Sequence, residues 1–243
     1  MRRKSSVRSV RPGYRSSIPR HARARVADRH ASGAPERVEY LVGRSVVGCR
    51  YFDPNGGLLL DYGVHRGKRH GREYRWDVPG TLLSATSYRN GLEHGTARQW
   101  SSDGRLLGTY RMRSGTGIDL WWQETWTKPR RTYLAEARFV KNGKRHGFEW
   151  WLNGDQRSVH QERHWSMNEL HGIEREWNDR RSLRPGFPRF YVRGRRVTRR
   201  SYDRKQKRDA SLPPYTPEDN RPQRDRHPIL GHLRRVRAIR RMR

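Results

Sequence analysis

The chain has 243 residues, enough for one medium domain with tails or for two small domains. Only 32% of the residues are hydrophobic, a poor supply for a thick globular core, while 9 Trp residues exclude a chain that is disordered throughout. The formal net charge of +31 favours binding to polyanions, although a base composition that favours Arg predicts the same charge.

The single cysteine, Cys49, excludes an intrachain disulfide and favours a reducing, cytoplasmic location. No apolar run approaches the roughly 18 residues of a membrane-spanning helix. The basic start of the chain lacks the apolar run that follows it in a secretory signal peptide. The sequence therefore predicts a protein without a transmembrane segment.

The composition changes along the chain and predicts four regions. Residues 1–37 are rich in Arg, Ser, Pro and Ala, and we expect a disordered basic arm there. Residues 40–202 contain the repeats analysed below. Residues 203–228 are polar and, from 211 on, Pro-rich, which predicts a linker or a strap across the fold. Over residues 229–243, apolar side chains recur between arginines and predict a short basic amphipathic helix.

A short phrase ending in His-Gly recurs through the middle of the chain. Its copies are His70-Gly71, His94-Gly95, His146-Gly147 and His171-Gly172, and a shortened copy stands at Gly115-Thr116-Gly117. The first two histidines are 24 residues apart and the last two are 25 apart, whereas the middle interval is longer. A fixed period of this size is the mark of a repeat protein, with an insertion near Lys128.

Large rings keep step with the His-Gly phrase. Five residues after its glycine stand Trp76, Trp100, Trp122 and Trp177, and turn residues follow each of them. Alternation around these rings predicts strands with one buried face, so each unit reads as strand, turn, strand, turn. We expect an all-β fold in which tandem hairpins form an elongated, twisted antiparallel ribbon with the indoles inside.

The repeated polar residues are predicted to be structural. We expect each histidine to fix a turn by bonding a backbone carbonyl, while the following glycine adopts positive φ. Glu73, Glu149 and Glu174 occupy one repeat position and should pair with neighbouring arginines. Equivalent histidines would lie about 10 Å apart, too far to share one metal ion. No catalytic motif is present, so we predict a protein without enzymatic activity, cofactor or metal.

The repeat resembles the MORN family in its bacterial variant, the YwqK-like antitoxin-type proteins. The similarity is carried by Asn142-Gly143-Lys144-Arg145-His146-Gly147 with Glu149 and Trp150, and by the Tyr-x-x-G pattern of Tyr88 and Gly91, and it covers roughly residues 40–202. This resemblance implies a ribbon of β-hairpins and no catalytic residues. It also implies roles such as membrane attachment, protein scaffolding or toxin neutralisation.

Two hypotheses about function follow. The first is a protein-binding module, either antitoxin-like or a scaffold. Its candidate surface comprises side chains that fall outside the repeated core position or lie in the inserted loop, namely Trp126, Lys128, Arg130, Arg131 and Trp151. The alternative is a nucleic-acid or anionic-membrane-surface binder, in which residues 1–37 and 229–243 supply the charge.

Overall fold

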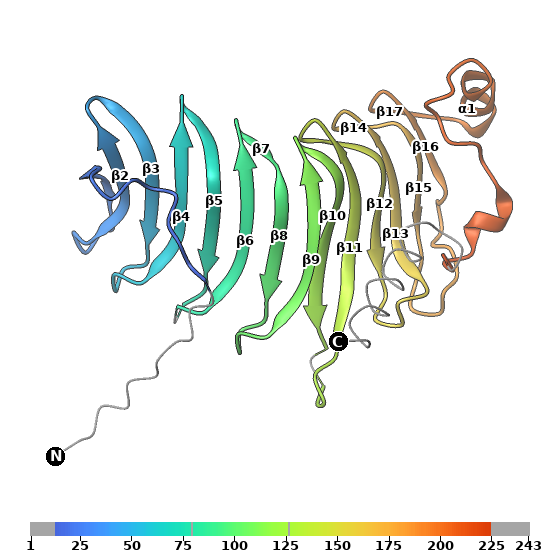
Figure 1. Cartoon of the computed structure of the whole chain (residues 1–243). Coiled ribbons are helices and arrows are strands. Elements are labelled where there is room, and N and C mark those ends of the chain that lie inside the picture. Colours follow the sequence, from blue (N-terminus) through green and yellow to red (C-terminus); the bar gives the residue numbers. More distant parts are fainter. Residues whose placement is uncertain (1–12, 79, 126, 225–243) are drawn as a thin grey trace. The chain divides into compact units, whose positions relative to one another are not determined.

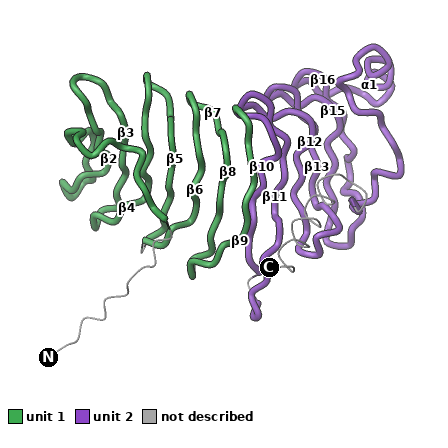
Figure 2. The backbone as a smooth tube through the Cα atoms, viewed as in Figure 1, with its two compact units in different colours: residues 1–114 green, residues 115–243 purple. Residues whose placement is uncertain are grey.

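The computed structural model describes residues 13–78, 80–125 and 127–224 (Figure 1). These residues form 17 strands, one short α-helix and one 3-10 turn, and every strand pairing is antiparallel. The predicted all-β fold of tandem hairpins is confirmed. The chain divides into two compact units, residues 1–114 and residues 115–243 (Figure 2). Within the described residues, no helix has the length and apolar character needed to cross a membrane.

Unit 1 is a sheet of strands that pair in chain order. Strand β6 pairs with both β7 and β8, because His94 interrupts the strand between them. The strands are β1 (Arg23–Arg29), β2 (Pro35–Val42), β3 (Ser45–Phe52), β4 (Leu58–His65), β5 (Lys68–Trp76), β6 (Leu82–Arg89), β7 (Leu92–Glu93), β8 (Gly95–Trp100) and β9 (Leu106–Arg113).

Unit 2 continues the same hairpin pattern and ends in helical segments. Here β13 pairs with both β14 and β15, interrupted at His171. The elements are β10 (Thr116–Glu124), β11 (Thr132–Lys141), β12 (Lys144–Leu152), β13 (Val159–Ser166), β14 (Glu169–Leu170), β15 (Gly172–Glu176), β16 (Arg189–Val192), β17 (Arg195–Val197), α1 (Arg199–Gln206) and the 3-10 turn η1 (Pro217–Asn220).

Two kinds of turn alternate along the chain. Most two-residue turns have positive φ at both central positions, as at Asn90 and Gly91 (51° and 84°), which matches the type I′ geometry that suits a twisted hairpin. Most of the longer loops begin with a polar residue whose side chain accepts a backbone N–H, as Asp77 Oδ1 does from Thr81 at 2.7 Å. The backbone of such a loop also occurs at His30, whose N–H donates to the carbonyl of Ala34 at 2.9 Å. The hairpins therefore begin before residue 40.

The core lies on one face of the sheet in each unit, which we call the Trp face because it carries the repeated Trp position. In unit 1, Trp76 alternates with Tyr74 on β5, and both pack with Leu82 and Ala85. In unit 2, Trp122 alternates with Leu120 on β10, and both are buried. We call the opposite face, which carries Glu73 in unit 1 and Glu149 in unit 2, the ladder face.

Residues 14–18 cross the Trp face of unit 1 and form a strap over β3, β4 and β5, as the dark blue segment in Figure 1 shows. The ring of Tyr14 packs edge-on against Tyr74 and Trp76, with centroids 5.0 and 5.2 Å away. Its hydroxyl donates to the fully buried Asp61 at 3.0 Å. Ile18 is buried against Gly48, where a Cβ atom would lie 2.4 Å from it.

The prediction of a disordered arm over residues 1–37 is therefore wrong for residues 13–37. Tyr14 and Ile18 are isolated among polar residues, so the local pattern gives no period, yet each meets apolar partners far along the chain. The strands β1 and β2 also form one more hairpin, in which Val26 faces Val38. The hairpin domain thus starts at Arg23, not at residue 40, and its last strand ends at Val197.

The C-terminal part of unit 2 corrects the predicted linker over residues 203–228. Residues up to Gln206 belong to α1, and Leu212 is buried with 1% exposure. Trp177 Nε1 donates to the carbonyl of Asn220 at 2.6 Å, and Val159 N donates to that of Pro222 at 2.9 Å. As far as residue 224 this segment is a strap, the alternative that the sequence left open. The helix predicted over residues 229–243 lies outside the described residues.

Candidate interaction surface

The repeated histidines join the turns of successive hairpins. His94 Nδ1 accepts a hydrogen bond from the backbone N–H of Ser114 at 3.1 Å, and His171 Nδ1 accepts one from Arg193 at the same distance. His70 Nδ1 lies 3.5 Å from the N–H of Asn90. The expected bond to a carbonyl is therefore wrong, because the ring accepts from an amide in the two-residue turn of the next repeat.

Two repeats vary this contact. In the shortened copy, the hydroxyl of Thr116 replaces the imidazole and accepts from the N–H of Asn142 at 3.1 Å. In the next repeat, Asn168 Oδ1 accepts from the N–H of Arg145 at 2.8 Å, and the buried Nδ1 of His146 has no hydrogen-bond partner among the described residues. A hydroxyl thus replaces the histidine in one repeat, and in the other the amide of the turn residue Asn168 makes the link between turns.

The glycines that follow these histidines all have positive φ, between 72° and 142°; they are Gly71, Gly95, Gly147 and Gly172. At Gly71 a Cβ atom would lie 2.4 Å from Ser17 Oγ of the strap, so the absence of a side chain is also required there. Among the repeated indoles, Trp76, Trp122 and Trp177 are buried, and Trp100 is partly buried against the cluster around Tyr74.

The ladder face of unit 2 carries a row of charges that alternate in sign from strand to strand. Consecutive members oppose each other in strand register or form an ion pair, and three are acidic and three basic: Asp119, Arg138, Glu149, Arg163, Glu174 and Arg189. The shortest contacts in the row are Arg138–Asp119 at 2.7 Å and Arg163–Glu174 at 2.9 Å. The positive and negative charges of the row therefore neutralise each other. Glu149 and Glu174 pair with neighbouring arginines, as expected for the repeated Glu position.

Aromatic rings hold this row in place. Glu149 is 1% exposed and accepts a hydrogen bond from Trp165 Nε1 at 2.8 Å. The guanidinium of Arg145 lies 3.9 Å from the centre of the Trp165 ring, a cation–π contact. Because both oxygens of the carboxylate have partners and the ring is held by its N–H and by a guanidinium on its face, these side chains present a preorganised surface.

The next row on the ladder face of unit 2 is aromatic and open to solvent. Trp121 and Trp151 both face Glu136 across the strands β10, β11 and β12. Trp121 is 49% exposed, whereas Trp151 is half-buried beneath the guanidinium of Arg163, 5.1 Å from its ring centre. Burial raises the pKa of Glu136, although Arg138 acts in the opposite direction.

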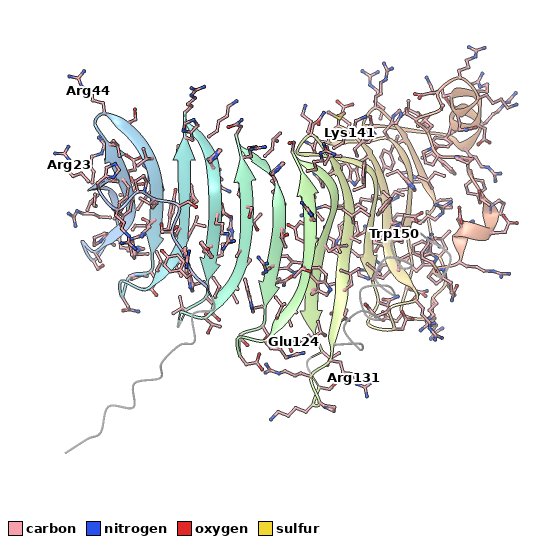
Figure 3. The ribbon with its side chains drawn as sticks, in the orientation of Figure 1. Arg23, Arg44, Glu124, Arg131, Lys141 and Trp150 are labelled. Atoms are coloured by element: carbon pink, nitrogen blue, oxygen red, sulfur yellow. The ribbon has the colours of Figure 1, made fainter. Side chains whose placement is uncertain are left out.

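The predicted binding residues do not form one surface. Lys128, Arg130 and Arg131 are exposed in the loop between β10 and β11, and Figure 3 shows Arg131 beyond the strand ends. Arg131 lies five residues from Glu136, about 17 Å along an extended strand, so this loop is separate from the row of Trp151. Trp126 lies outside the described residues.

Sequence reasoning missed Trp121, the exposed ring of this row. The signal was present in the pair Trp121-Trp122: neighbouring residues on a strand point to opposite faces, and Trp122 holds the repeated core position. The same reasoning had selected Trp151 beside Leu152.

Comparison with known proteins adds no relative. No protein-family model matches this chain, and no curated protein matches it.

Proposed function

We propose that the protein is a non-catalytic, MORN-like interaction module that binds a protein partner with the ladder face of unit 2, as an antitoxin-like or scaffold protein. The observation that carries this proposal is the exposure of Trp121. Of the eight Trp residues that the structure describes, it alone is exposed, and it stands beside a fixed row of ion pairs. Trp, Tyr and Arg dominate the binding energy of protein interfaces.

The charge pattern of the ladder face favours a protein over a nucleic acid as the partner. Acidic and basic side chains alternate along the row, so no strong positive potential accumulates there. Nucleic acids, by contrast, are held mainly through unpaired cations on phosphates. The alternative of basic arms loses much of its first arm, because residues 13–37 belong to the folded unit.

A comparison of Trp121→Ala with the matched variant Leu106→Ala tests the proposal. Leu106 is also an exposed apolar side chain, 37% exposed on β9 of unit 1. Proteins retained from extracts of the native host would be identified, purified and titrated against each variant. We expect Trp121→Ala to weaken a one-to-one complex by about 2 kcal/mol, roughly thirtyfold, and Leu106→Ala to leave it unchanged.

Three outcomes contradict the proposal: no partner forms a stoichiometric complex, both variants weaken it equally, or Trp121→Ala loses binding because it unfolds. Circular dichroism and urea unfolding of both variants identify the last case. If the retained molecule is RNA or DNA, and its affinity falls steeply with salt, the nucleic-acid alternative replaces this proposal.

A further inference from the structure

A pocket of about 800 Å³ lies in unit 2 between α1 and the turn that joins β16 to β17. Its volume is within the range of about 300–1,000 Å³ typical of small-molecule sites. Five of its lining residues are cationic and exposed: Arg193, Arg204, Lys205, Lys207 and Arg208. Asp209 is the one acidic residue in the lining.

The backbone that carries these cations is firmly anchored. Arg193 occupies the two-residue turn, and its N–H donates to the buried His171. On the other side, Tyr202 of α1 is fully buried, packs 5.1 Å from the Phe190 ring and donates its hydroxyl to the carbonyl of Pro213 at 2.6 Å. The backbone around the pocket is therefore held in place by buried contacts, while the ends of the cationic side chains are exposed.

The cations of this pocket lack the carboxylate partners that the arginines of the ladder row have. In the part of the chain that the structure describes, no carboxylate forms an ion pair with any of the five. Asp209 accepts hydrogen bonds from the N–H and hydroxyl of Ser211, which lower its pKa, and it lies 3.5 Å from His171. The charge of Arg193 also lowers this pKa, so Asp209 offsets part of the positive charge of the lining.

Two simpler explanations do not account for this cluster. A composition bias toward Arg accounts for scattered exposed cations such as Arg195 and Arg196, but it does not gather five cations around one pocket. Cations in the last turn of a helix also complement its dipole, which amounts to about half a negative charge. Together with Asp209, that charge offsets fewer than two of the five cations, so the lining keeps a positive excess.

We infer that this pocket binds an oligophosphate group, carried by a soluble molecule or by a lipid headgroup. Phosphate oxygens accept bidentate hydrogen bonds from Arg and point-charge contacts from Lys, the two kinds of donor that converge here. A bound anion would relieve the mutual repulsion of the five cations. This site is independent of the ladder face and of a protein partner there.

Calorimetric titration of the full chain with inorganic tripolyphosphate, at about 0.15 M ionic strength, tests the inference. The pocket variant is Arg204→Ala with Lys205→Ala, which keeps helix-forming residues in α1. The control is Arg44→Ala with Lys141→Ala, which removes one Arg and one Lys charge from exposed positions outside the pocket; both residues are labelled in Figure 3. We expect one site per chain, a loss of affinity of about tenfold or more in the pocket variant, and no more than about a twofold change in the control.

A parallel titration with vesicles that contain phosphatidylinositol bisphosphate, whose headgroup carries several phosphates, distinguishes the two sources of phosphate. If the chain binds tripolyphosphate and the pocket variant loses this binding, a soluble ligand is supported. If the chain binds only the vesicles and the pocket variant loses that binding, a lipid headgroup is supported. Equal loss in both variants, several weak sites per chain, or no binding of either probe would overturn the inference, because the net charge alone would then explain any attraction. A melting temperature of the pocket variant close to that of the wild type excludes unfolding as the cause.

Discussion

Replacing Glu162 with Gln should destabilise the protein by about 3 kcal/mol at neutral pH, because this carboxylate neutralises two buried arginines. Glu162 is 4% exposed on the Trp face of unit 2. Its carboxylate receives Arg175 at 2.5 Å and Arg224 at 3.1 Å, and Trp150 Nε1 donates to it at 2.8 Å. A Gln side chain keeps an acceptor for the indole but removes the charge.

The magnitude can be worked out in two ways. Burial alone would raise the pKa of Glu162, but the charges of His164, Arg224 and Arg175 and a hydrogen bond from Arg224 lower it to about 2 from 4.5. At about 1.4 kcal/mol per unit, this difference corresponds to roughly 3 kcal/mol. Breaking a buried ion pair by removing one partner costs about 3–5 kcal/mol, which agrees.

The pH dependence supplies the sharper assay. Since the folded pKa is depressed, the stabilisation is present above pH 4.5 and is lost as the pH falls toward 2. Urea unfolding followed by Trp fluorescence should show the free energy of unfolding of the wild type decreasing more steeply in that window than that of Glu162→Gln. Glu136→Gln is the matched control, because burial raises the pKa of Glu136 and its loss should be neutral or stabilising at pH 7. Parallel pH curves for wild type and Glu162→Gln would refute the reasoning.

Three further predictions concern the strap, a turn histidine and a glycine. Tyr14→Phe should cost about 1.5–3 kcal/mol in urea unfolding through the lost bond to Asp61, and Tyr14→Ala about 3–5 kcal/mol; equal costs would contradict the contribution of the ring. Burial lowers the pKa of His171, so its contribution is present above about pH 6.5 and is lost as the pH falls; His171→Gln should flatten the stability profile below about pH 6.5. Gly71→Ala should lower the melting temperature more than Gly91→Ala, because both have positive φ but only Gly71 lacks room for a Cβ atom; equal shifts would leave backbone strain as the whole cause.

The period of the sequence predicted the hairpins because local features determine them. Positive φ at glycines and a ring five residues later recur within each unit, so a single strand and turn carry the signal. The first hairpin escaped this reasoning because β1 carries neither the His-Gly phrase nor the repeated ring, although Ser32-Gly33 in the loop after it marks a turn like Asp103-Gly104. A repeat search based on one phrase finds only the units that retain it.

The straps could not be predicted from local pattern, because their anchors depend on contacts distant in sequence. Ile18 fills space left by Gly48, and Ser17 lies where side chains at Gly63 and Gly71 would stand. These glycines look like ordinary strand or turn glycines until the strap is in place. The candidate surface was predicted only in part for a related reason. The alternation that identifies Trp151 also identifies Trp121, but the exposure of each ring depends on a contact distant in sequence, because Arg163 covers Trp151 and leaves Trp121 exposed.

The two proposed sites differ in how charge is arranged, and this difference separates them experimentally. On the ladder face of unit 2, each arginine of the row opposes a carboxylate, so partner binding there should depend mainly on Trp121 and change little with salt. In the pocket beside α1, five cations lack such partners, so anion binding should weaken as the logarithm of the salt concentration rises. Trp121→Ala should therefore leave tripolyphosphate binding intact, and the Arg204 and Lys205 double variant should leave the protein complex intact. Cross-effects between the two variants would show that one surface serves both ligands, and the assignment of two independent sites would then fail.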